Sequence, residues 1–276
     1  MIFADRKLSQ RLERAEGFSC AQFAEARRRL FPESESEWME CGGAFTVFDG
    51  ANSPITQTFG LGLFQDLNGT VLDEIERFFL DRGSPVQHEV SPFVGADALD
   101  LLCRRNYRPI ELSSVLFQPI ADALESHAER SADTKASGVT VRRIEREEAG
   151  LWSKISTRGW SHDYPELAEI MQELSVITAA REQTICFLAE VDGQPGAAGV
   201  LCIHEGIAVF GGAATVPELR KRGLQTALLA ARMRYAFTAG CDLAMVVALP
   251  GSESQRNAER KGFQIAYTRT KWQLCS

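Results

Sequence analysis

Three basic residues directly precede a glycine in the stretch ELRKRGLQTALLAAR, which runs from Glu218 to Arg232. An apolar stripe at helical spacing follows the glycine, so the stretch predicts a turn that leads into a helix. Cations usually favour the carboxyl end of a helix, where they face the negative end of its dipole. At the amino end they are favourable when an anion binds between them and the free backbone amides of the first turn. The pattern therefore indicates either a phosphate site or an ordinary turn with solvated basic side chains.

The glycine and the basic side chains suit a phosphate site for separate reasons. Gly223 lacks a Cβ that would block the approach of a ligand to the backbone. Arg220, Lys221 and Arg222 would add charge-assisted hydrogen bonds. Other phosphate-binding patterns are weaker: the sequence has no G-x-x-x-x-G-K-[ST] loop, and GLGLFQ (60–65) has only two of the three glycines of a dinucleotide-binding fingerprint.

The elements that must position this turn follow from the periodicity of the apolar residues. The first half predicts a helix over 5–30, strands over 42–50 and 56–64, a helix over 71–82, a strand over 85–92, a helix over 96–105 and a strand over 111–120. The second half predicts a strand over 138–145, helices over 147–160 and 165–181, three strands within 184–215, a helix over 223–239, a strand over 243–250, a helix over 252–261 and a strand over 263–274. Asp192-Gly193 and Glu205-Gly206 predict the tight turns between the three strands.

The stretch AATVPELRKRGLQTALL (213–229) resembles the signature V-x-P-x-x-[QR]-x-x-G-x-[GA] of the GNAT acyltransferase superfamily. Pro217, Arg220 and Gly223 match the signature, whereas Gln225 stands where the family has Gly or Ala. At the first position of the signature, where the family has valine, this chain has Thr215, which is also β-branched.

The resemblance extends beyond the turn. NAERKGF (257–263) is similar to the family's closing helix and its Gly-Phe ending, and the order of elements also agrees, so the resemblance covers about 138–276. It implies that the turn grips the pyrophosphate of acyl-coenzyme A.

The two halves of the chain predict the same order of helix, strand, helix and strand near their ends. Gly83 matches Gly240, and Tyr107 matches Phe263. We therefore expect an α/β (α+β) protein made of two tandem GNAT folds, each a mixed central sheet flanked by helices.

The expected domains are a degenerate copy over 1–120, a linker over 121–137 and an acetyl-coenzyme A-binding GNAT domain over 138–276. In the first copy, Asp66 replaces the basic residues before the helix. An acidic loop would repel pyrophosphate, so one coenzyme site is expected.

The resemblance also implies which residues contact the coenzyme. The pantetheine arm would pair with the backbone of a strand end, and the pyrophosphate would meet amides of the turn and the first helical turn. These cofactor-binding residues are Ala213, Ala214, Thr215, Lys221, Arg222, Gly223, Leu224, Gln225 and Thr226. Asn257 on the closing helix is expected to face the coenzyme or to belong to a capped helix start.

Catalytic residues are less defined by the sequence. Many GNAT enzymes have on the closing helix a tyrosine that protonates the leaving thiolate, but Ala258 occupies that position here. Glu205 and Tyr267 are the candidates for acid–base chemistry. Their structural alternatives are a solvated hairpin turn for Glu205 and a packed strand position for Tyr267.

The segment RGWSHDYPE between the first two helices of the second half would line the acceptor pocket of a GNAT fold. Trp160, His162 and Tyr164 are the candidate substrate-binding residues, because they supply aromatic walls and a group that can ionise near an amine. The alternative is a capped loop with Trp160 in the core.

Composition excludes several other classes. The net charge of −7 argues against nucleic-acid binding. The sequence contains no run of about 18 apolar residues, so we expect no membrane-spanning helix. The four histidines have no metal-ligand spacing with the cysteines. The seven cysteines form no C-x-x-C pair, which is typical of reduced thiols in a cytoplasmic protein.

The resemblance therefore predicts an N-acetyltransferase that transfers an acetyl group from acetyl-coenzyme A to a primary amine of a small molecule. The alternative is a non-catalytic acyl-coenzyme A-binding regulatory or structural protein. The sequence leaves open whether the chain is a monomer or a homodimer.

Overall fold

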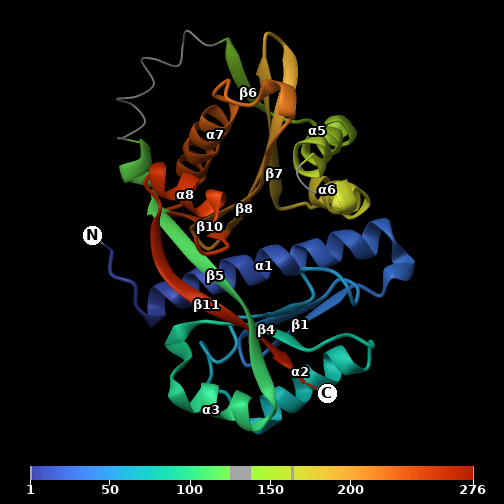
Figure 1. The fold of residues 1–276 in the computed structure, drawn as a ribbon, viewed down its shortest axis with the longest axis vertical. Helices are drawn as coiled ribbons and strands as arrows, with labels where there is room; N and C mark the ends of the chain where they lie inside the picture. The colour runs from blue at the N-terminus through green and yellow to red at the C-terminus, as the bar shows by residue number, and fades with distance from the viewer. Residues whose placement is uncertain (1, 125–137, 163–164, 276) are drawn as a thin grey trace. The chain divides into compact units, whose positions relative to one another are not determined.

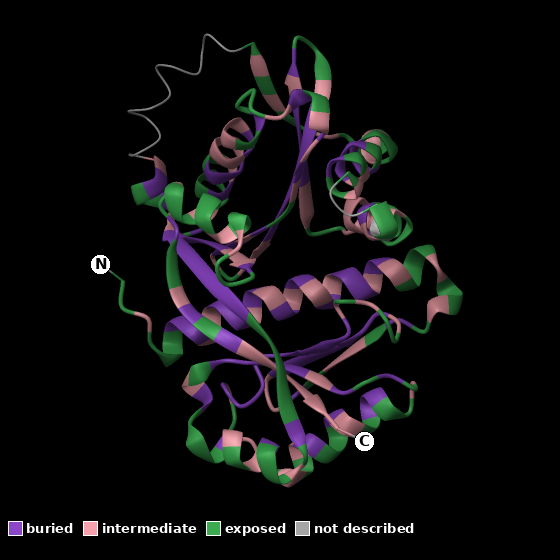
Figure 2. Ribbon diagram, in the orientation of Figure 1, coloured by how far each residue is buried: buried purple, intermediate pink, exposed green. Residues whose placement is uncertain are grey.

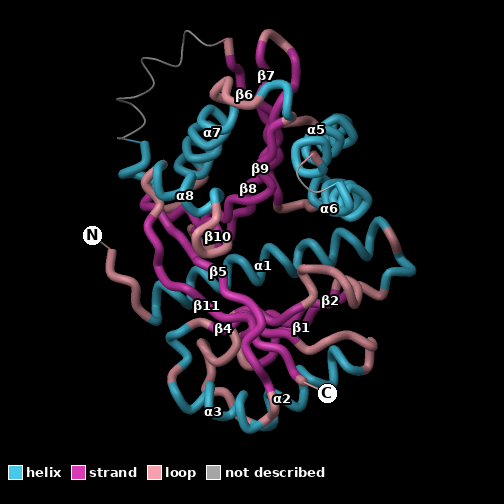
Figure 3. Tube along the Cα trace, viewed as in Figure 1, coloured by secondary structure: helices cyan, strands magenta, loops and turns pink. Residues whose placement is uncertain are grey.

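The computed structural model describes residues 2–124, 138–162 and 165–275, and it mixes helices and strands (Figure 1, Figure 3). The chain folds into two compact units that do not coincide with its two halves. Unit 1 consists of Met1–Phe117 together with Met245–Ser276, and unit 2 consists of Gln118–Ala244. The predicted linker lies mostly outside the described residues, and residues 120–124 are helical.

Unit 1 contains elements from both ends of the chain. They are α1 (Arg6–Leu30), η1 (Pro32–Ser34), β1 (Glu37–Cys41), β2 (Ala44–Phe48), β3 (Gln57–Phe59), α2 (Gly69–Leu80), β4 (Gln87–Val90), η2 (Pro92–Val94), α3 (Ala96–Arg104), β5 (Tyr107–Pro119), α8 (Glu253–Arg260) and β11 (Gln264–Leu274). The last two residues of β5 belong to unit 2.

The sheet of unit 1 has the strand order β1-β2-β3-β4-β11-β5. The β3–β4 pair is parallel, and the other pairs are antiparallel. The strand β11, from the end of the chain, therefore lies between β4 and β5 of the first half. The predicted domain over 138–276 assigned this segment to the second copy, whereas the structure packs it with unit 1, because its hydrogen-bond partners are there.

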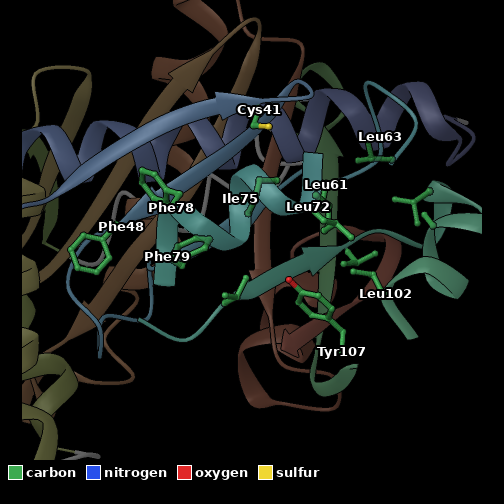
Figure 4. Close-up of a cluster of buried hydrophobic side chains, with 14 residues drawn as sticks. Cys41, Phe48, Leu61, Leu63, Leu72, Ile75, Phe78, Phe79, Leu102 and Tyr107 are labelled. Atoms are coloured by element: carbon green, nitrogen blue, oxygen red, sulfur yellow. The ribbon is translucent and has the colours of Figure 1, made fainter. Parts of the chain in front are cut away.

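The core of unit 1 lies between the sheet and the helices α2 and α3. Figure 4 shows apolar side chains from α2, including Leu72, Ile75 and Phe79, turned toward residues of the strands. The helix α1 covers other strand residues, and along most of its length buried positions alternate with partly buried ones (Figure 2). At Gly17 a Cβ would lie 2.7 Å from the Phe45 ring, so only glycine permits this close approach.

Unit 2 contains β6 (Val139–Arg143), η4 (Arg146–Glu148), α5 (Ala149–Ser161), η5 (Pro165–Leu167), α6 (Ala168–Ala180), β7 (Thr184–Val191), β8 (Gln194–His204), β9 (Ile207–Thr215), η6 (Pro217–Leu219) and α7 (Leu224–Thr238). The strand β10 (Leu243–Ala248) begins in unit 2 and ends in unit 1.

The strands β6 to β9 of unit 2 pair in sequence order, and each pair is antiparallel. Helix α7 lies on one side of this sheet, and α5 with α6 lies on the other (Figure 1). Positive φ angles at Asp192 and Gly193 confirm the first predicted tight turn, and those at Glu205 and Gly206 confirm the second. Trp152 of α5 is buried and donates its indole N–H to the Phe187 carbonyl at 3.1 Å.

The predicted helices agree with the structure to within a few residues, but two strands of the first half differ. The strand β1 (Glu37–Cys41) was not predicted. The predicted strand over 56–64 is strand only over Gln57–Phe59, because Gly60 and Gly62 take positive φ angles and turn the chain. Within the described residues, no helix combines the length and apolarity needed to cross a bilayer, and no cluster of metal-ligand side chains occurs.

Candidate functional site

A bulge interrupts β9 near its carboxyl end. A single residue of β8, Gly199, lies opposite two residues of β9, Gly212 and Ala213. The extra residue of a bulge has no partner in the strand ladder. Gly211 and Gly212 are exposed, and Gly212 has a φ of 55°, in the left-handed region. This part of β9 therefore presents backbone polar groups to solvent.

The turn that follows β9 has two residues in left-handed conformations. After η6, Lys221 has a φ of 64° and Gly223 has a φ of 84°. A Cβ on Gly223 would meet no atom within 4 Å. The backbone conformation therefore favours glycine, and the space beside the glycine is open to a ligand.

The start of α7 is available to an anion. Gly223 is the N-cap and, as glycine, supplies no side-chain acceptor for the amides of the first turn. Leu224 is buried and anchors the helix, whereas Gln225 is exposed and donates to the Thr215 hydroxyl at 2.7 Å. The N–H groups and the positive end of the helix dipole thus face the open side of the turn.

The three basic residues of the turn have different surroundings. Arg220 donates to the carbonyls of Thr215 at 3.4 Å and Gly159 at 3.2 Å, so its guanidinium holds the turn against β9 and α5. Arg222 is exposed and pairs with Asp192 at 3.2 Å. Lys221 is exposed and has no ion-pair partner in the described part of the chain. Lys221 and Arg222 are therefore the cations that an anion at this turn would meet.

Helix α5 approaches β9 very closely beside the turn. A Cβ on Gly159 would lie 2.5 Å from the Ala214 Cβ, so only glycine fits there. The neighbouring Trp160 is 37% exposed, which places it at the surface and not in the core. His162 ends α5 and is exposed, and Tyr164 lies outside the described residues.

Glu205 is not close to the turn. It occupies the hairpin between β8 and β9 with a φ of 45°, and its side chain is 66% exposed beside His204. The nine residues of β9 separate this hairpin from the turn by roughly 30 Å, at about 3.3 Å for each residue. The structure therefore gives Glu205 the solvated hairpin position that was its alternative.

The remaining predicted residues lie in unit 1. The Tyr267 hydroxyl is buried and donates to the Glu13 carboxylate at 2.9 Å. Burial and the nearby Glu13 charge raise the pKa of Tyr267 well above its usual value. Asn257 is exposed on α8, next to Ala258. The roles proposed for Tyr267 and Asn257 stay predictions.

The corresponding turn of the first half satisfies its own polar groups. Asn68 caps α2 by accepting the Val71 N–H at 3.1 Å. Arg6 of α1 donates to the Leu63 carbonyl at 3.2 Å, so this turn directs carbonyl oxygens toward α1. Asp66 adds a negative charge near the helix start. These features do not suit a phosphate ligand.

Sequence reasoning missed one buried residue beside β9. Arg232 of α7 is 4% exposed and donates to the Gly211 carbonyl at 3.3 Å. The signal was present: Arg232 follows Leu228 by four positions, so it falls on the apolar stripe of the helix. The bulge was also missed, although the Gly211-Gly212 pair within a predicted strand is typical of one.

Comparison with known proteins identifies the domain that contains this turn. Residues 147–263 match the family model described as "Acetyltransferase (GNAT) family". No curated protein sequence matches the chain.

Several solved structures have a similar fold over most of the chain. The GCN5-related N-acetyltransferase from Kribbella flavida is 16% identical, with a TM-score of 0.60 over 93% of this chain and 96% of that one. The crystal structure of FemX is 10% identical, with a TM-score of 0.58 over 100% and 97%. A tandem GNAT protein from the clavulanic acid biosynthesis pathway is 12% identical, with a TM-score of 0.51 over 75% and 70%.

Proposed function

This chain carries a GNAT-family domain, and from that premise we propose that it is an N-acetyltransferase that moves an acetyl group from acetyl-coenzyme A to a primary amine of a small molecule. The observation that carries the proposal is the open turn at Gly223, where a left-handed glycine precedes α7 and supplies no side-chain cap.

The pyrophosphate of the coenzyme binds at this turn. The amides from Lys221 to Thr226 supply donors along the first turn of α7, and Gly223 leaves the space for the ligand. Lys221 and Arg222 supply positive charge on exposed side chains.

The pantetheine arm lies along the carboxyl half of β9. Ala213, Ala214 and Thr215 offer main-chain groups to an extended ligand, which can add to a strand as another strand would. We expect the thioester end of the arm to lie at the bulge, because Gly211 and Gly212 are exposed there. An amine brought to the thioester carbonyl there attacks it, and positioning supplies much of the acceleration.

The acceptor binds beside α5. Trp160 and His162 are exposed at the end of α5, which packs on β9 through Gly159. A small amine held there would lie next to the strand that carries the thioester. Tyr164 belongs to the same proposed pocket but lies outside the described residues.

A single coenzyme site per chain is proposed, because the first half lacks the features of the second. Its helix start is capped by Asn68, whereas Gly223 leaves α7 uncapped. We expect the chain to be a degenerate copy followed by an active copy.

Calorimetric titration of the full chain with acetyl-coenzyme A tests the proposal. We expect one site per chain and a loss of affinity of at least about tenfold for Gly223→Asp, because the carboxylate repels phosphate and fills the open space. Gly240→Asp is the matched control, since Gly240 ends the same helix with a φ of 80° and open space around it. Equal affinity of the two folded variants would refute the site assignment.

A non-catalytic coenzyme-binding protein is the second candidate. It is favoured by Ala258, which stands where many GNAT enzymes have a tyrosine. Release of free thiol from acetyl-coenzyme A in the presence of a panel of primary amines distinguishes the two. Binding without thiol release from any amine would favour the non-catalytic role.

A further inference from the structure

A buried arginine lies beneath the bulge of β9, and no carboxylate among the described residues pairs with it. Arg232 of α7 is 4% exposed, and its contacts in the described part of the chain are carbonyl oxygens and one aromatic ring. Burying a cation without a carboxylate is costly, so such a residue needs a compensating role. Burial lowers the pKa of Arg232 to about 10, and the guanidinium stays protonated at neutral pH.

The hydrogen bonds of Arg232 converge on the two strands that form the bulge. Its Nη1 donates to the Val200 carbonyl of β8 at 3.1 Å and to the Gly211 carbonyl of β9 at 3.3 Å. Its Nε donates to the Leu228 carbonyl at 3.4 Å, which ties the group to its own helix. Arg232 thus occupies the position where the bulge interrupts the ladder between the strands.

A glycine makes room for this guanidinium. A Cβ on Gly199 would lie 3.2 Å from the Arg232 Cζ, so a larger residue there would crowd the group. The Phe210 ring lies beneath it, with its centroid 5.0 Å from Cζ. These contacts on several sides hold the Arg232 side chain in one position. A side chain held in this way can in turn hold the backbone groups to which it donates.

The chemical consequence follows from the peptide group that Arg232 contacts. The Gly211 carbonyl and the Gly212 N–H belong to one peptide group, so a cation bonded to the carbonyl draws electron density from the N–H and makes it a stronger donor. Gly212 is exposed, on the part of β9 that the thioester end of the coenzyme reaches under the proposed function.

We propose that Arg232 is a positioning residue that fixes and polarises the Gly211–Gly212 peptide, so that the Gly212 N–H binds the thioester carbonyl of the acyl donor. The inference rests on the proposed function. During attack by the amine, the carbonyl oxygen gains the electron pair of the breaking C=O π bond, and a stronger N–H donor stabilises that developing oxyanion. The C=O bond then re-forms as the C–S bond breaks, and its electron pair leaves with the thiolate. The new C–N bond remains as the amide, and the proton lost by the amine nitrogen passes through water to the thiolate.

The test uses Arg232→Gln and, as a second variant that keeps the charge, Arg232→Lys. Arg234→Gln is the matched control, because Arg234 is exposed two positions along the same helix. The probes are acetyl-coenzyme A labelled with ¹³C at the carbonyl, whose infrared stretch reports hydrogen bonding, and adenosine 3′,5′-bisphosphate, which lacks the thioester arm.

We expect the carbonyl stretch of acetyl-coenzyme A to lie at lower frequency on the wild-type protein than in water. In Arg232→Gln it shifts back toward the value in water, and the ratio of acetyl-coenzyme A to coenzyme A affinity falls about fivefold, as for the loss of one hydrogen bond. Affinity for adenosine 3′,5′-bisphosphate stays within about twofold, because the phosphate site is at the other end of the arm. Arg232→Lys shows a smaller shift than Arg232→Gln.

Two results overturn the inference while leaving the proposed function in place. One is a wild-type protein that binds acetyl-coenzyme A without lowering the carbonyl frequency, a result that needs no folded variant. The other is a folded Arg232→Gln variant with the wild-type frequency. A wild-type protein that does not bind acetyl-coenzyme A overturns the proposed function, and the inference with it.

Discussion

Replacing Glu13 with glutamine should make the protein less sensitive to alkaline pH. Glu13 of α1 is completely buried, and Arg269 of β11 donates to both of its carboxylate oxygens, at 3.0 and 2.9 Å. Glu16 and Glu89 also bind Arg269, and Lys271 lies 3.7 Å from Glu89. Glu111 also lies 3.6 Å from Lys271, so four carboxylates face two cations, and a proton on Glu13 would reduce this excess of negative charge.

The magnitude follows from the pKa of Glu13, which is raised from 4.5 to about 7. Burial is the largest cause, and the attraction of Arg269 only partly offsets it. Because the folded state holds the proton more tightly than the unfolded state, stability from this group is complete below pH 4.5 and is lost as the pH rises through 7. One pKa unit is equivalent to about 1.4 kcal/mol, so the loss between pH 5 and pH 8 is about 2 to 3 kcal/mol.

Glutamine carries no charge at either pH, so Glu13→Gln removes this loss. Its amide nitrogen would face the Arg269 donor, which costs some stability, but equally at every pH. The assay is urea unfolding of the wild-type protein and the variant at pH 5 and at pH 8. We expect the variant to gain about 2 to 3 kcal/mol relative to the wild type between these pH values.

Exposed Glu33 provides the control for this experiment. Glu33→Gln makes the same chemical change at an exposed position, so it is the reference for the pH dependence of Glu13→Gln. Titration of other groups, including buried His88, cancels when the variants are compared at each pH. If Glu13→Gln and Glu33→Gln show the same pH dependence, the assignment of a buried, proton-binding carboxylate to Glu13 is refuted.

Three further perturbations test the fold and the site. Asn68→Ala removes the cap of α2 and should lower the unfolding free energy by about 1 kcal/mol in urea, with no change in acetyl-coenzyme A affinity by calorimetry. Gly159→Val should force α5 away from β9, lower the unfolding free energy by about 1 to 3 kcal/mol and weaken acetyl-coenzyme A binding. Gly150→Val is the control on the same helix, where space is open, and it should have neither effect. Deletion of residues 264–276 removes Arg269 and the strand between β4 and β5, so circular dichroism should show loss of unit 1 structure; a native spectrum would contradict the described sheet.

Local signals in the sequence predicted most helices and the turn at Gly223. Helix boundaries depend on caps and apolar periodicity, which neighbouring residues determine. The turn was predicted because a left-handed glycine before a helix depends on a few adjacent residues. The GNAT fold was inferred from the same turn together with the order of elements, and the family match and similar structures confirm it.

The sequence by itself thus determined the elements, the hairpins of unit 2 and the position of the candidate coenzyme turn. Only the tertiary structure decided that β11 pairs with β4 and β5, and that Arg269 meets Glu13 across 256 positions of the chain. It also decided that Arg232 lies beneath the bulge of β9. The physical reason is that any strand can donate and accept backbone hydrogen bonds. Periodicity therefore specifies which face of a strand is buried, while packing of the whole chain specifies its neighbours.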